Sequence, residues 1–131
     1  MMRSKMLSHR WFAVLALAWP LKALAVEIEE IPRDKFDLKI ETCDVAVEFG
    51  SECCGIDPTT FANVTEFIRV SNLIDRARRY SWGREGEQTY CLSISTPAAA
   101  KRIFMEIMDL LPPKQKPLDP ISISMPKSDR R

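Results

Sequence analysis

The chain has 131 residues, with 19 Lys plus Arg against 18 Asp plus Glu, so its formal net charge is +1 at pH 7. This length allows one domain with one core and no more. The near balance of charge excludes a strongly basic nucleic-acid binder. The chain also holds four cysteines and a single histidine, which limit the chemistry it can perform.

The first 25 residues have the pattern of a secretory signal peptide. Basic residues precede an apolar run over residues 11–21, and Ala23-Leu24-Ala25 follows in the small-residue pattern of a cleavage site. We therefore predict that residues 1–25 are removed by a cut after Ala25. The alternative is an uncleaved membrane anchor, but a span needs about 20 apolar residues, and Pro20 and Lys22 interrupt this run.

Cleavage changes the composition on which function depends. The leader carries four basic residues and no acidic one, which leaves 15 Lys plus Arg against 18 Asp plus Glu, a net charge of about −3. It also carries His9, the only histidine, so the mature chain has no Ser-His or Cys-His nucleophile pair and no imidazole metal ligand. We expect an exported protein that no longer spans a membrane and does not bind nucleic acid, in the periplasm if the source is bacterial and otherwise secreted.

Charge is unevenly distributed along the mature chain. Residues 26–66 hold 11 acidic and three basic side chains, and residues 67–131 hold seven acidic and 12 basic ones. Such asymmetry can mark a surface for a partner, but folding can also bring the two halves together and cancel the field. We favour cancellation.

The first part of the mature chain is acidic and then alternates in polarity. Residues 26–35 are rich in Glu and contain Pro32, which predicts a loosely held N-terminal arm. The apolar residues Phe36, Leu38 and Ile40 then recur with the period of a strand. The alternation changes phase at Thr42-Cys43, which indicates a bulge or a break. After that point four residues are expected on one face of a strand: Cys43, Val45, Val47 and Phe49.

The rest of the chain predicts two helices, a hairpin and a last strand. Asp57-Pro58 and Thr96-Pro97 both combine a capping side chain with proline at the first helical position, and a helix is expected after each. Between them, strands over residues 74–82 and 88–95 flank two turn glycines. The second helix is expected over residues 98–111, with an apolar stripe formed by Ile103, Phe104, Ile107, Met108 and Leu111. A final strand follows over residues 121–125, and the basic tail 127–131 is expected to be disordered.

The resulting order, strand-helix-strand-strand-helix-strand, is that of a ferredoxin-like βαββαβ sandwich over residues 36–126. In this topology two helices cover one face of a four-stranded antiparallel sheet, and the second strand lies at an edge. Arginines on that strand would protect the edge from pairing with another chain. The alternative is a binding patch formed by Arg76, Arg78, Tyr80, Trp82 and Arg84. We favour edge protection.

The four cysteines of an exported domain this small indicate two disulfides. Cys53 and Cys54 lie beyond the end of the strand that follows Cys43, roughly 20 Å away at about 3.3 Å per residue. A disulfide needs Cα atoms within about 7 Å, so we favour a bridge from Cys43 to Cys91 on a neighbouring strand. This leaves Cys53 and Cys54 as a vicinal disulfide, as two thiols, or as partners of another molecule.

Cys53 and Cys54 precede the first helix, where the helix dipole favours thiolates. The position resembles that of the metal-binding cysteines in heavy-metal-associated domains, including periplasmic mercury carriers, which share this order of elements. Those domains use the spacing Cys-x-x-Cys, whereas here the cysteines are adjacent, so the resemblance is one of topology and loop position. It implies soft-metal binding or thiol redox chemistry as the alternative function of the chain.

The sequence favours binding over catalysis. Acylphosphatases share the predicted fold and need an arginine in the loop after the first strand, and residues 50–56 contain none. The carboxylates Asp44 and Glu48 are expected on a solvated face of the strand. We therefore predict no catalytic residue, no cofactor and a protein partner, as for an immunity protein, an enzyme inhibitor or an accessory subunit of an envelope assembly.

Overall fold

A five-stranded mixed sheet is the centre of the fold in the computed structural model, which describes residues 26–129. The signal peptide predicted over residues 1–25 lies outside the described residues. Among residues 26–129, no helix is both long enough and apolar enough to cross a bilayer.

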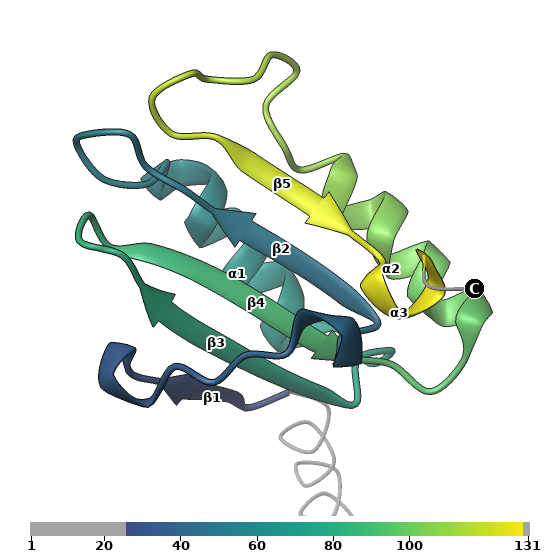
Figure 1. Ribbon diagram of the computed structural model, residues 1–131. Coiled ribbons are helices and arrows are strands. Elements are labelled where there is room, and N and C mark those ends of the chain that lie inside the picture. The colour runs from purple at the N-terminus through teal and green to yellow at the C-terminus, as the bar shows by residue number, and fades with distance from the viewer. Residues whose placement is uncertain (1–25, 130–131) are drawn as a thin grey trace, which may run out of the picture.

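The elements follow one another in an α+β arrangement (Figure 1). In chain order they are β1 (Ile28–Ile31), the 3-10 helices η3 (Arg33–Lys35) and η4 (Ile40–Thr42), β2 (Val45–Phe49), α1 (Pro58–Val70), β3 (Arg76–Trp82), β4 (Glu87–Ser93), α2 (Pro97–Met108), β5 (Ile121–Ser124) and α3 (Pro126–Asp129). Figure 1 shows α1 and α2 behind one face of the sheet, while the segment with η3 and η4 crosses the opposite face.

The strands are arranged in the order β1-β3-β4-β2-β5. The pairs β3–β4, β4–β2 and β2–β5 are antiparallel, and β1 pairs with β3 in parallel. The prediction of a four-stranded, wholly antiparallel sheet is therefore wrong. The Arg-rich strand β3 is also not an edge of the described sheet, because β1 covers its outer side.

β1 forms within the acidic segment 26–35, which the sequence predicted to be a loose arm. Ile28 and Ile31 lie opposite Ala77 and Tyr80 in the parallel register. The two glutamates between these isoleucines form ion pairs with arginines of β3, Glu29 with Arg76 and Glu30 with Arg79. The arginines of β3 thus match the charge of the acidic arm, whose backbone pairs with β3 as a strand.

The alternating segment after β1 is not a strand. Residues 36–39 connect η3 to η4, which begins at Ile40. The apolar side chains of this segment cover the sheet, and its backbone is not a strand of the sheet. Phe36 meets the ring of Tyr80 edge-on, with centroids 5.8 Å apart, and Leu38 and Ile40 pack around the same residue and two cysteines. Polarity alternates in this segment because one side of the crossing chain packs on the sheet and the other faces solvent. A half-buried strand has the same pattern.

Both helices begin where their caps predict. Asp57 accepts a hydrogen bond from the Thr60 amide at 3.1 Å, and Thr96 accepts one from the Ala99 amide at 3.1 Å. A proline follows each cap at the start of the helix, where its missing N–H has no intrahelical partner to lose. The local signals at both helix starts are therefore sufficient to place them.

The sheet carries an apolar core on each face. The larger core lies under α1 and α2 and includes Val47, Phe49, Ile68, Tyr90 and Ile103, all at most 1% exposed. The smaller one lies under the crossing segment and consists of four buried residues: Cys43, Ala46, Tyr80 and Cys91. Burial on both faces explains why β4 reads as a nearly continuous run of buried residues.

The C-terminal end partly departs from the prediction. The expected last strand is present as β5, but residues 127–129 of the predicted disordered tail belong to the short helix α3. The backbone amide of Lys127 donates to the carbonyl of Cys43 at 3.2 Å, which ties α3 to the start of β2.

Candidate binding groove

The five residues of the binding patch predicted on β3 differ in exposure: Arg76 and Arg84 are exposed, Arg78 and Trp82 are half-buried, and Tyr80 is buried. Tyr80 is 2% exposed, and the Arg78 guanidinium lies 5.8 Å from the centre of its ring. Arg76 is engaged by Glu29, and the Trp82 indole donates to the hydroxyl of Thr89. Of the five residues proposed for the patch, Arg84 lies apart in the exposed turn after β3. The predicted patch is therefore only partly open to a partner, and binding there stays a prediction.

The Cys43–Cys91 pair is bonded in the structure, with Cα atoms 5.2 Å apart. The prediction that Cys43 shares a face with Val45 is wrong, because a bend at Asp44 places Cys43 on the face of Ala46 instead. Both cysteines are at most 1% exposed. This bridge joins the crossing segment to a central strand.

Cys53 and Cys54 form a vicinal disulfide in the exposed loop between β2 and α1. The loop is held by two hydrogen bonds, from the Gly55 amide to the Ser51 hydroxyl at 2.9 Å and from the Glu52 amide to the Leu118 carbonyl at 2.8 Å. Gly55 has φ of +108°, a conformation that favours glycine. In the bonded form neither sulfur is a thiolate ligand. Among residues 26–129, no group of three or more His, Cys, Asp or Glu side chains is placed to hold a metal ion.

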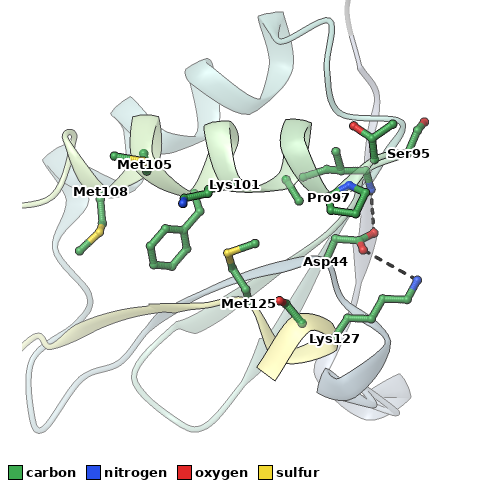
Figure 2. A pocket seen from close by; sticks show the side chains of 13 residues that line it. Asp44, Ser95, Pro97, Lys101, Met105, Met108, Met125 and Lys127 are labelled. Carbon is green, nitrogen blue, oxygen red and sulfur yellow. Dashed lines mark hydrogen bonds and ion pairs between the residues drawn. The ribbon is translucent and has the colours of Figure 1, made fainter. Parts of the chain in front are cut away.

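A groove of about 700 Å³ lies between α2 and the end of the chain. Its α2 wall contains Phe104, Met105 and Met108, and Met125, directly after β5, lies on the other wall (Figure 2). Met105 is 56% exposed and Met108 51% exposed, high values for side chains of this size. The volume is within the range of ligand-binding clefts, which is roughly 300–1,000 Å³.

Charged residues gather at one end of the groove. Asp44 accepts a hydrogen bond from the Ile94 amide at 2.8 Å, and the Lys127 ammonium lies 3.8 Å from its carboxylate. Figure 2 shows Asp44 and Lys127 together at this end, and Lys101 farther along α2, toward Met105. Ser95 and Thr96 complete the polar lining where α2 begins.

The sequence did not predict the groove. Met108 was expected in the buried stripe of the second helix, but it is half exposed, because the sheet contacts a narrower arc centred on Ala100, Ile103 and Ile107. One signal was present in the sequence. Met105 extends the apolar arc of the helix beyond the width that one core contact needs.

Asp57 fixes the loop that leads into β5. Its buried carboxylate caps α1 and also accepts a hydrogen bond from the Lys116 ammonium at 3.1 Å. Burial alone raises the pKa of this carboxyl. The hydrogen bonds from the amide and hydroxyl of Thr60 and from Lys116, together with the Lys116 charge, outweigh burial and bring the pKa below its ordinary value. The ionised group therefore ties the segment before β5 to α1.

The chain was compared with known proteins by family model, by sequence and by structure. No family model, no curated protein and no solved structure matches it. Inference about function therefore rests on the groove and the disulfides.

Proposed function

We propose that this chain is an exported, non-enzymatic domain that binds another protein through the groove between α2 and β5. The observation that carries the proposal is the exposure of Met105 and Met108 on one wall of a 700 Å³ groove. Methionine side chains are unbranched and polarizable, so they adapt to apolar segments of varied shape. Apolar groups left exposed together in a concave site are typical of binding surfaces.

The cellular location belongs to the same proposal. Two disulfides are compatible with an oxidising compartment, as the leader-like segment 1–25 also predicts. The partner would be an enzyme that the chain inhibits, a toxin that it neutralises or a subunit of an envelope assembly. Each of these partners would fit this location. The absence of histidine from residues 26–131 supports binding over catalysis.

We also propose that the fold is a ferredoxin-like unit to which β1 has been added. The strand order β3-β4-β2-β5, with α1 and α2 as the two connections on one face, supports this assignment. The added strand is what makes the sheet mixed.

Paired surface variants test the proposed groove. Met108→Lys places a charge in the groove, and Val70→Lys is the matched control, because Val70 is 62% exposed at the end of α1. Each protein is used to capture partners from the compartment in which it resides, with quantitative mass spectrometry. We expect one polypeptide that the original protein and Val70→Lys retain equally and that Met108→Lys loses by about tenfold or more. A set of captured proteins that is identical for all three would contradict the proposal.

A second candidate function is thiol–disulfide exchange at Cys53 and Cys54. The exposure of both residues in the bonded state favours it, because an external dithiol can reach their sulfur atoms. Reduction would take two electrons and two protons from that dithiol, which becomes a disulfide while Cys53 and Cys54 become thiols. Equilibration with glutathione of defined ratio, followed by thiol counting, tests this. Full oxidation of Cys53 and Cys54 at the glutathione ratio of the cytosol would show a strongly reducing pair. A pair that is always reduced in the native compartment would instead make soft-metal binding the second candidate function.

A further inference from the structure

The outer edge of β5 offers backbone groups beside the groove. The Gly50 amide donates to the Pro120 carbonyl at 2.8 Å, and the register continues to the pair Val47 and Ile123. Residues of an antiparallel strand alternate between bonding to the neighbour and facing away from it. Since Pro120 bonds to β2, Ser122 also bonds to β2, and Ile121 and Ile123 turn their N–H and C=O groups to the outer edge.

The backbone N–H and C=O of Ile121 already form hydrogen bonds with a side chain. The Gln115 amide donates to the Ile121 carbonyl at 3.0 Å and accepts from the Ile121 amide at 3.3 Å. Gln115 thus makes the pair of bonds that a neighbouring strand would make. The N–H and C=O of Ile123 take part in none of the loop, cap or side-chain hydrogen bonds formed within residues 26–129. Ile123 does not line the groove, but it lies two residues before Met125, which does, so an open strand position lies at the margin of the groove.

We infer that the occupant of the groove is an extended peptide segment that adds a strand to the outer edge of β5, an inference that rests on the proposed binding function. In this mode backbone bonds to Ile123 hold the segment, and every second side chain enters the space beside Phe104 and Met108. A helical occupant would use the apolar wall but would leave the Ile123 groups unpaired, which is costly once water is excluded.

The charges at the groove specify the chemistry of the segment further. Lys127 is engaged by Asp44, while Lys101 forms no ion pair within residues 26–129. The start of α2 adds the positive end of a helix dipole near Ser95 and Thr96. The complementary segment is apolar at alternate positions and carries a carboxylate that reaches Lys101.

The probe for this inference is a phage-displayed library of linear 12-residue peptides, selected on the purified, oxidised protein. Peptides are kept when they bind Val70→Lys but not Met108→Lys, which confines the selection to the groove. Each kept peptide is then synthesised with one N-methylated amide at a time, and its affinity is measured by calorimetry.

Strand addition predicts an alternating result. N-methylation of the residue whose N–H faces Ile123 should weaken binding by about tenfold or more, because it removes a backbone hydrogen bond and blocks the edge, while methylation of the residue before or after it changes affinity by about threefold or less. Groove-dependent peptides without such alternation would overturn strand addition and leave the proposed function intact. A library that yields no peptide dependent on Met108 would contradict both.

The charge component has its own variant. Lys101→Gln should weaken the selected peptides by about threefold to tenfold and reduce the salt dependence of binding. Lys114→Gln, in the loop before β5 and outside the groove lining, is the control and should leave the affinity unchanged. Equal affinity for the original protein and Lys101→Gln at low salt would overturn the assignment of an acidic segment.

Discussion

The two outer strands of the sheet, β1 and β5, are four residues each, but their surroundings differ. β1 has the sequence Ile-Glu-Glu-Ile, and its carboxylates engage arginines of β3. β5 has the sequence Ile-Ser-Ile-Ser, which carries no charge, and an apolar groove lies beside it. Charge on an edge strand discourages pairing with another chain. We infer from this difference that β1 completes the domain, and we propose that β5 is the edge to which a partner binds.

The largest change in stability should come from removing the Cys43–Cys91 disulfide, which lies on the β1 side of the molecule. Replacing Cys43 and Cys91 with alanine frees the crossing segment that connects β1 to β2 and opens the smaller core. We expect a loss of about 2–5 kcal/mol in the free energy of unfolding, measured with urea. The double variant Cys53→Ser/Cys54→Ser is the comparison, because its bridge is exposed and spans adjacent residues, and it should lose about 0.5 kcal/mol or less. Equal losses would show that the two bridges have equivalent roles.

The next effect concerns the support of the β5 side. Asp57→Ala removes the cap of α1 and the partner of Lys116, and we expect a loss of about 1–2 kcal/mol by the same urea measurement. In the original protein the pKa of Asp57 is lower in the folded than in the unfolded state. Its contribution is therefore fully present above the unfolded value and is lost as pH falls below about 4. The variant should lack this part of the acid dependence, and an unchanged acid profile would contradict the assigned role.

A smaller effect is expected at the edge of β5 itself. Gln115→Ala leaves the Ile121 groups without their side-chain partner, which should cost about 0.5–1.5 kcal/mol of stability. It also lengthens the open edge, so self-association measured by sedimentation should rise with protein concentration. Gln88→Ala on the central strand β4 is the control. If Gln115→Ala is as stable and as monomeric as that control, Gln115 does not protect the edge of β5.

The smallest effect should come from the charged edge. Glu30→Gln breaks the ion pair with Arg79. Because the Glu30 carboxylate is mostly exposed, the free energy of unfolding should fall by about 0–1 kcal/mol. It should shrink further in high salt, because exposed ion pairs are screened. A loss well above 1 kcal/mol that falls steeply with salt would contradict this expectation, because it would mean that charge and not backbone pairing is what mainly holds β1.

Several parts of this structure were predictable because their causes are local. The caps at Asp57 and Thr96 and the glycines of the hairpin act within a few residues, so the sequence locates the helix starts and the turn. The pairing of Cys43 with Cys91 followed from the reach of a strand.

The parts that sequence reasoning missed depend on distant partners. β1 is a strand because β3 lies beside it, and nothing within residues 26–35 specifies that parallel pairing. Phe36, Leu38 and Ile40 alternate as a strand would, but the face they cover exists only after the sheet has formed. The groove arises where α2 meets the last strand, so the exposure of Met108 was not deducible from the helical period alone.

We propose that a protein partner binds at the α2–β5 side of the molecule. Photo-cross-linking in the living source cells tests it most directly, with a benzophenone amino acid placed at Met108 in one strain and at Val70 in another. The account predicts one cross-linked polypeptide of defined mass from position 108 and none from position 70. The same products at both positions, or products at position 70 alone, would contradict it.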